Sequence, residues 1–265
     1  MVRVSAAMPF LYQKRCIPSA LVLFAILLQA CVQTDVCSRT KQVVAQIENI
    51  TQKKCAEVGP EDLAKVTTIQ VLNQPPEDFV LELKVGDFDG LGLISLSILN
   101  TSVESLPDGI FRNLEKLSQL QIIGNQLTQI QKGLFSDLKN LKTLNIQSNS
   151  ITELSSDFFM GISELETFSI STNSLKELPE DLFQNVKKLR QIDLGSNALE
   201  TLPFGIFQNL TQLSQVQMAD NYLKMLPDNI FDHLFTLTTV VWSNNLLSED
   251  NMAKIRAKNP KVTFQ

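Results

Sequence analysis

Two residue types recur along this chain with a common period of 24 residues. The first is an asparagine, found at Asn125, Asn149, Asn173, Asn197, Asn221 and Asn245. The second is a phenylalanine, which keeps the same step at Phe111, Phe135, Phe159, Phe183, Phe207 and Phe231. Two ladders in step over half of the chain indicate one short supersecondary unit that is repeated and stacked, because each copy can bury its apolar face only against a neighbour. Arrays of this kind usually bind ligands along one long face and rarely carry out chemistry.

Each copy reads L-x-x-L-x-L-x-x-N-x-L-x-x-L-P-x-x-I/L-F-x-x-L, as in the copy that starts at Leu117. This pattern resembles the 24-residue "typical" leucine-rich repeat, as found in bacterial extracytoplasmic lipoproteins with such repeats. The match runs from about Leu93 to Leu247, after a degenerate first copy that begins at Val66 and is stretched by about three residues. The resemblance implies an α/β solenoid, the leucine-rich repeat horseshoe. It would have short parallel β-strands on the concave face, an irregular or 3₁₀ convex side, and short helical caps at both ends.

The residues independently favour the same architecture. Apolar side chains alternate at period two in L-x-x-L-x-L, as a short strand buried on one face requires. Seven or eight such strands, about 4.8 Å apart, would make a parallel sheet roughly 30–35 Å across. The asparagine ladder is predicted to be structural, because its amides can satisfy backbone groups in their own coil and in the next. The phenylalanine ladder is predicted to form a stacked spine on the convex side.

Both ends of such a stack need polar covers. A helix over Thr40 to Gln52 would place apolar residues at helical spacing against the first coil, namely Val43, Val44, Ile47 and Ile50. At the other end, Ser248 is predicted to cap a helix from Glu249 to Lys258 whose Met252 and Ile255 face inward, and Val262 and Phe264 to add a last strand. Trp242 is expected to shield the end of the core. The predicted domains are a signal peptide (1–30), an N-terminal linker and helical cap (31–65), leucine-rich repeats (66–247; one degenerate, six full and one truncated) and a C-terminal cap (248–265).

The first 30 residues resemble a lipoprotein signal peptide. Lys14 and Arg15 form a positive patch, and the fourteen residues from Ile17 to Ala30 contain no charge, a length too short for a membrane span and suited to a signal-peptide core. The segment 28–31, Leu-Gln-Ala-Cys, resembles a bacterial lipobox, although its Gln29 stands where a small residue is common. Lipidation is therefore predicted at Cys31, with the outer membrane, cell surface or periplasm as the location and soluble secretion as the alternative. Translation could start at Met1 or at Met8.

Cys37 and Cys55 remain after Cys16 leaves with the signal peptide and Cys31 takes the lipid. In an oxidising compartment they are expected to form a disulfide across 18 residues, worth about 3 kcal/mol of loop entropy; two free thiols are the alternative. The only histidine, His233, takes a polar convex-side position in its repeat. No metal site, cofactor or catalytic constellation is predicted, so an enzyme is not expected.

The charge of the chain limits the classes of partner that it can bind. Without residues 1–30 the chain carries 20 basic and 28 acidic residues, a balance that gives no electrostatic footprint for nucleic acid. Strand side chains that point away from the core form three columns of seven, and Asp193 is the only charged residue among these 21. Leu99 and Ile123 make an apolar spot at the N-terminal end of this concave face, a candidate anchor.

The concave face is predicted to bind a protein or glycan partner. The residues assigned to this ligand site are Ser97, Leu99, Gln119, Gln121, Ile123, Thr143, Asn145, Gln147, Thr167, Ser169, Gln191, Asp193, Gln215 and Gln217. Short polar side chains also suit a curved sheet that binds nothing. The predicted function is thus a monomeric, extracytoplasmic interaction module held to a bacterial envelope by its lipid. The alternatives are a secreted eukaryotic receptor-type repeat protein and a purely structural envelope lipoprotein.

Overall fold

The computed structural model describes residues 35–73, 80 and 82–265. The chain divides into Met1–Asp35 and Val36–Gln265, and the second unit carries all the secondary structure described. The predicted signal peptide and the lipidation site Cys31 lie outside the described residues. The elements in chain order are η1 (Val36–Ser38), α1 (Lys41–Thr51), η2 (Cys55–Glu57), α2 (Pro60–Leu63), β1 (Thr68–Leu72), β2 (Ser95–Leu99), β3 (Gln119–Ile123), β4 (Thr143–Asn145), β5 (Thr167–Ser169), β6 (Gln191–Asp193), β7 (Gln215–Gln217), β8 (Thr239–Val241), α3 (Glu249–Lys258) and β9 (Thr263–Phe264).

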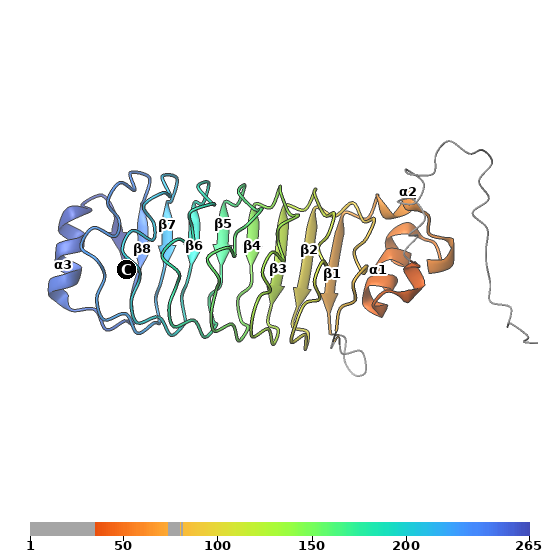
Figure 1. Cartoon of the computed structure of the whole chain (residues 1–265), viewed down its shortest axis with the longest axis horizontal. Coiled ribbons are helices and arrows are strands. Elements are labelled where there is room, and N and C mark those ends of the chain that lie inside the picture. Colours follow the sequence, from red (N-terminus) through yellow and green to blue (C-terminus); the bar gives the residue numbers. More distant parts are fainter. Residues whose placement is uncertain (1–34, 74–79, 81) are drawn as a thin grey trace, which may run out of the picture. The chain divides into compact units, whose positions relative to one another are not determined.

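The nine strands form one parallel sheet in sequence order, with β1 to β8 side by side between α1 and α3 (Figure 1). From β2 to β8 each residue pairs with the residue 24 positions later, as Ser95 does with Gln119. Between β1 and β2 the step is 27 residues, as in the pair of Thr68 with Ser95. The extra three residues are those by which the first repeat was expected to be stretched. The predicted solenoid of parallel strands is confirmed.

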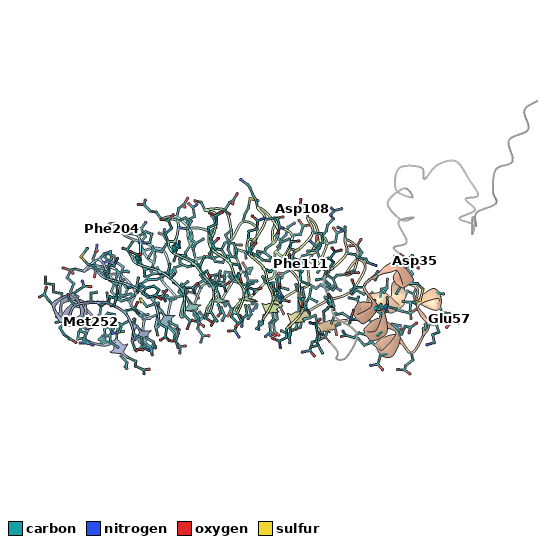
Figure 2. All side chains as sticks on the ribbon, turned by 90° about the horizontal axis from the view of Figure 1, so that it is seen from below. Asp35, Glu57, Asp108, Phe111, Phe204 and Met252 are labelled. Carbon is teal, nitrogen blue, oxygen red and sulfur yellow. A yellow bond between two sulfur atoms is a disulfide. The ribbon has the colours of Figure 1, made fainter. Side chains whose placement is uncertain are left out.

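The core lies behind the sheet. Alternate strand residues such as Leu96 and Ile98 are fully buried, and all six phenylalanines of the ladder have at most 2% exposure. Figure 2 shows Phe111 within the stack, whereas Asp108 and Phe204 lie at its periphery. The residues between consecutive strands form turns closed by isolated i to i−3 bonds, such as that from Ile110 N–H to the Pro107 carbonyl at 3.1 Å.

The aromatic spine runs along the stack with one interruption. Ring centroids lie 6.1 Å apart at small interplanar angles for Phe111–Phe135, Phe183–Phe207 and Phe207–Phe231. In the middle of the stack Phe158 inserts its ring edge-on, 5.6 Å from Phe135 and 4.8 Å from Phe159. Phe158 stands where most repeats have Ile or Leu, so the extra ring turns the spine locally into an edge-to-face cluster.

Each ladder asparagine joins two coils. Asn197 donates to the carbonyls of Ile170 and Leu194, both at 3.1 Å, and its Oδ1 accepts from the Leu175 N–H at 3.1 Å. Asn149, Asn173, Asn221 and Asn245 repeat this pattern with a step of 24. Asn125 also donates to the preceding coil, at the Ile98 carbonyl, but its Oδ1 accepts from the N–H and the hydroxyl of Thr101. The coil reached is the preceding one rather than the next one expected from the sequence. The side-chain amide lies where its strand ends. At that point the carbonyl of the preceding coil has no partner in the sheet, so the amide donates to it.

A row of left-handed residues precedes each asparagine position, a feature that the sequence analysis did not identify. The row comprises Asn100, Gly124, Ser148, Thr172, Ser196, Asp220 and Asn244, with φ between 49° and 68°. Asn, Asp, Gly and Ser tolerate this region, but β-branched Thr172 at φ 57° is strained there. The row gives strands β2 to β8 the same sharp exit.

The N-terminal cap has the predicted helix, α1. Val43 and Ile47 are fully buried, but Ile50, which was expected to face inward, is 45% exposed, because the helix covers only the edge of the first coil. The predicted disulfide between Cys37 and Cys55 is confirmed, with Cα atoms 5.2 Å apart. The side-chain amide of Gln46, also on α1, bonds to both the N–H and the carbonyl of Gln70. It thereby occupies the free edge of β1.

The C-terminal cap also has the predicted elements. The Ser248 hydroxyl accepts from the Asn251 N–H at 3.2 Å and begins α3, whose Ile255 is fully buried. Trp242 is 3% exposed and stacks on Phe264 of β9, with ring centroids 4.5 Å apart. Within residues 35–73, 80 and 82–265, no helix combines the length and apolar character needed to cross a bilayer.

Candidate functional site

The concave face is the side of the sheet that points away from the core, and the strand register fixes its columns. The first column is Ser95, Gln119, Thr143, Thr167, Gln191, Gln215 and Thr239; the second is Ser97, Gln121, Asn145, Ser169, Asp193, Gln217 and Val241. The third column begins in register with Leu99 and Ile123 and continues beyond the shorter strands β4 to β8. Strand β1 extends all three columns with Thr68, Gln70 and Leu72.

The residues assigned to ligand binding are mostly accessible on this face. Gln119, Gln191, Gln215 and Gln217 are exposed, and the others, apart from Ser169, are half-buried. Ser169 is an exception, since it is only 9% exposed. Its hydroxyl lies 3.3 Å from the Ser171 hydroxyl and donates to Asp193 at 3.1 Å. Ser169 therefore orients Asp193 and is not placed to contact a ligand directly.

Asp193 is held in place by two hydrogen bonds. Its Oδ2 accepts from the Ser169 hydroxyl at 3.1 Å and its Oδ1 accepts from the Gly195 N–H at 3.0 Å. The carboxylate is half-buried, and its third-column neighbours Gly195 and Ala219 carry little or no side chain. The one charge of the concave face is therefore oriented by its own coil and remains open toward the neighbouring small residues.

The amides of the face are also partly organised. The Gln121 side-chain oxygen accepts from the hydroxyl of Ser97, on the preceding coil, at 3.2 Å. Asn145 Oδ1 accepts from the Gln147 N–H at 3.1 Å, as Asp193 does from Gly195 in a later coil. These contacts leave donors and acceptors free for a ligand while they limit side-chain freedom, which lowers the entropic cost of binding.

Charged residues at the edge of the face form a small ion-pair cluster. Lys142, Glu166 and Arg190 directly precede β4, β5 and β6, and Glu166 pairs with Lys142 at 3.0 Å and with Arg190 at 3.7 Å. The hydrogen bond from Lys142, and then its charge, lower the pKa of the Glu166 carboxyl. Two cations share one carboxylate, so these three residues carry one net positive charge beside the face.

The N-terminal end of the face is apolar. Leu72, Leu99 and Ile123 are consecutive partners in the strand register, and all three are half-buried. The sequence analysis identified Leu99 and Ile123; Leu72 was missed because the stretched first repeat shifts it out of the 24-residue step. The register thus lengthens the candidate anchor from two residues to three.

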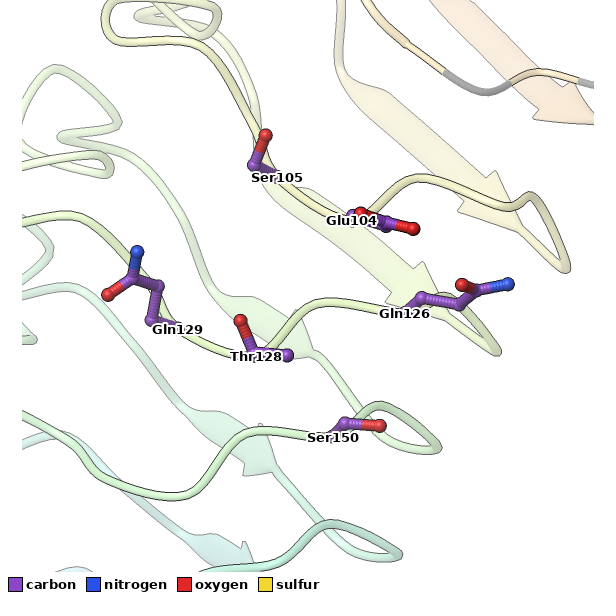
Figure 3. Close-up of a pocket in the computed structure, with 6 residues that line it drawn as sticks. All are labelled: Glu104, Ser105, Gln126, Thr128, Gln129 and Ser150. Carbon is purple, nitrogen blue, oxygen red and sulfur yellow. The ribbon is translucent and has the colours of Figure 1, made fainter.

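A polar hollow lies on the flank of the stack, beyond the ends of the strands (Figure 3), and was not predicted. Its volume is about 560 Å³, and it is lined by Glu104, Ser105, Gln126, Thr128, Gln129 and Ser150. These residues occupy equivalent positions of successive repeats, so their 24-residue spacing was a signal that could have found it. The lining holds neither an aromatic ring nor a cation.

The same flank becomes apolar toward the C-terminus. Tyr222, Met225 and Leu246 are 57%, 67% and 58% exposed. Tyr222 and Leu246 are equivalent to Gln126 and Ser150 of the hollow. The flank therefore changes from polar to apolar along the stack, whereas the concave face is made mostly of amides and hydroxyls apart from its apolar end and Asp193.

Groups with catalytic or metal-binding chemistry are dispersed over the described residues. No cluster of three or more His, Cys, Asp or Glu in that part of the chain could hold a metal ion. His233 is exposed on the convex side, where its ring lies 6.5 Å from that of Phe235. Its environment resembles that of the polar residues at the same position in other repeats.

Comparison with solved structures gives the fold. An LRR protein of Leptospira interrogans, LIC12759, aligns with a TM-score of 0.55 and 21% identity over 74% of this chain and 54% of its own, so this chain spans about half of its length. Internalin C2 of Listeria monocytogenes aligns with a TM-score of 0.68 and 19% identity over 85% of this chain and 93% of its own. TLR13, in its complex with ssRNA13, aligns with a TM-score of 0.68 and 21% identity over 87% of this chain and 34% of its own.

Sequence comparison gives the family. No curated protein matches the chain significantly. A family model described as a BspA-type leucine-rich repeat region matches in six copies, over residues 82–200 and 148–253. Proteins with this fold are typically interaction scaffolds. Because the matched repeats cover well over half of the sequence, the chain belongs to the BspA-type leucine-rich repeat family.

Proposed function

We propose that this protein is an extracytoplasmic interaction module, lipid-anchored to a bacterial envelope, that binds a protein partner on its concave face. One observation carries the proposal. The 24-residue step places 21 outward positions in three columns along seven coils, and Asp193 is the only charged residue among them, although charged residues make up 19% of the chain. About four charged residues would be expected among 21 positions of average composition, so this face carries less charge than the chain as a whole.

The chemistry of the face favours a polypeptide ligand. Its amides and hydroxyls can bond to peptide groups, and the apolar row of Leu72, Leu99 and Ile123 offers a place for one apolar side chain. A glycan could use the same polar groups but would gain little from the apolar row. One structural neighbour was solved with a single-stranded RNA; here the excess of 28 acidic over 23 basic residues opposes nucleic-acid binding.

Arginine substitutions test the face. The variant carries Gln121→Arg, Asn145→Arg, Gln191→Arg and Gln217→Arg, which avoid buried Ser169. Its matched control carries Gln184→Arg, Gln208→Arg, Thr211→Arg and Gln212→Arg, all exposed positions outside the concave columns. Both variants and the wild type are assayed against a displayed library of ten-residue peptides and against a glycan array.

Binding that the concave variant loses and the control keeps supports the proposal. Peptide binding unchanged in the concave variant contradicts it. Hits confined to the glycan array make the partner a carbohydrate. Absence of any hit with the wild type favours a purely structural envelope protein.

The lipid anchor has its own test. The protein is produced with its leader in a Gram-negative host, beside Cys31→Ser, and the intact mass is measured. A mature mass that begins at Cys31 and includes the acyl groups, lost in the variant, supports the bacterial lipoprotein. An unacylated mass that begins near Cys31 makes it a soluble secreted repeat protein, the alternative compatible with a eukaryotic source.

A further inference from the structure

The concave face has two features that differ from its neutral surface, and they lie at different coils. The first is the apolar row of Leu72, Leu99 and Ile123, on β1 to β3. The second is the Asp193 carboxylate, on β6. The surface between them consists of short amides and hydroxyls, such as Asn145 and Thr167.

We infer that the concave face recognises an extended protein segment that carries an apolar side chain and a lysine or arginine five or six residues apart. The apolar side chain packs on the row of Leu72, Leu99 and Ile123, and the cation pairs with Asp193. This inference rests on the proposed binding role of the concave face and specifies its partner.

The strand spacing sets the distance between the two contacts. Asp193 lies three strands beyond Ile123 and four beyond Leu99, which corresponds to about 14–19 Å at about 4.8 Å per strand. The anchor residues lie in the third column and Asp193 in the second, which adds an offset of about 7 Å along the strands. The direct separation is therefore about 16–20 Å, and an extended segment at about 3.3 Å per residue spans it in five or six residues.

The surroundings of Asp193 favour the binding of a cation to its carboxylate. Its two hydrogen bonds, from Ser169 and the Gly195 N–H, fix the carboxylate and leave further acceptor capacity on both oxygens. A Cβ added at Gly195 would lie 3.2 Å from Asp193 Oδ1, so a side chain there would crowd the carboxylate. The 21 outward positions contain no lysine or arginine, so nothing of the face itself competes for the charge.

The charge of the whole protein acts in the same direction. The chain has a formal net charge of −5, which outweighs the one net positive charge of the edge residues Lys142, Glu166 and Arg190. A basic segment would be attracted to this protein from a distance and then positioned by the one carboxylate of the face. An acidic segment would find no cation on the face to meet it.

Selection from a displayed library of random ten-residue peptides tests the inference. The wild type is compared with Asp193→Asn, whose amide oxygen can still accept from the Gly195 N–H and whose amide N–H can donate to the Ser169 hydroxyl. It is also compared with Ile123→Ser, and with Asp181→Asn as an exposed control outside the concave face. We expect the wild type to enrich Lys or Arg five or six positions from Leu, Ile, Phe or Met. Asp193→Asn should weaken the selected peptides by about tenfold or more, whereas Asp181→Asn should not.

The two variants should fail in different ways. Asp193→Asn should still select the apolar residue without the cation, and Ile123→Ser should select the cation without the apolar residue. Wild-type peptides with no basic preference, or an unchanged preference with Asp193→Asn, overturn the inference. The inference is also overturned if no peptide from the library binds the wild type more strongly than it binds the four-arginine concave variant.

The same experiment separates this inference from the proposed function. Peptides that lack the basic residue but are lost in the four-arginine concave variant leave the concave face as the binding surface and refute only the two-point partner. Peptides that bind the four-arginine concave variant undiminished refute both.

Discussion

The carboxylate of Asp87 accepts hydrogen bonds from both the backbone N–H and the hydroxyl of Thr40, at 2.7 Å and 2.6 Å, across 47 residues of sequence. Asp87 is fully buried and also accepts from the Lys84 N–H at 2.7 Å. Next to Thr40, Arg39 donates to the carbonyls of Asp87 and Asp89. Burial lowers the pKa of Arg39, against the charges of Asp89 and Asp87, which raise it. The start of α1 is thereby fixed to the turn that closes the first coil.

Asp87→Ala should lower the free energy of unfolding by about 3 kcal/mol or more, because it leaves the N–H groups of Thr40 and Lys84 and the Thr40 hydroxyl without their acceptor in a buried site. Exposed Asp108→Ala, on the next coil, should change it by less than about 0.5 kcal/mol. Urea denaturation of both variants measures the difference. Equal stabilities would mean that the cap is held by other contacts.

Reduction of Cys37–Cys55 should destabilise the cap by about 3 kcal/mol, since the bond closes a loop of 18 residues. Denaturation with and without dithiothreitol measures the effect, and a Cys37→Ser, Cys55→Ser variant should match the reduced protein. If the double variant is as stable as the oxidised wild type, the disulfide contributes nothing to the fold.

Asn197→Ala should cost about 2–4 kcal/mol, because the Leu175 N–H and the carbonyls of Ile170 and Leu194 lose their partner in a buried site. Asn209→Ala is the matched control, an exposed asparagine on the convex side. Thermal unfolding of the two variants decides the matter. A loss of similar size at Asn209 would remove the special role of the ladder.

Thr172→Asn should stabilise the protein by about 1 kcal/mol, because asparagine tolerates the left-handed backbone that a β-branched residue resists. The same change at Thr167, in the extended backbone of β5, should destabilise it. Melting temperatures of both variants provide the test, and a loss of stability at Thr172 would show that its side chain outweighs the backbone strain.

Glu166 should contribute stability only above acidic pH. Its carboxyl has a lowered pKa in the folded protein, chiefly through Lys142. Its contribution is therefore present above the ordinary value of about 4.3 and is lost as the pH falls through the lowered folded value. The difference in stability between the wild type and Glu166→Gln should be positive at pH 7 and smaller at pH 3. A difference that is the same at both pH values would contradict this account.

Much of this architecture could be predicted from the sequence because the repeat is local. Within each coil, the alternation around Leu120 and Ile122 decides which strand side chains are buried, and the 24-residue step decides which coils pair in register. The helix of the C-terminal cap could be predicted for the same reason, since Ser248 satisfies a donor of its own first turn.

Contacts between positions that are not equivalent required the tertiary structure. The sequence could not show that Phe158 interrupts the aromatic spine or that the Ser169 hydroxyl donates to Asp193. Nor could it show that Leu72 joins the apolar row. The bond between Thr40 and Asp87 belongs to the same group. The period determines how one coil repeats, because each coil meets a copy of itself. Where a coil meets something different, such as a cap, an irregular repeat or an extra ring, the contact depends on how the side chains fill that particular space.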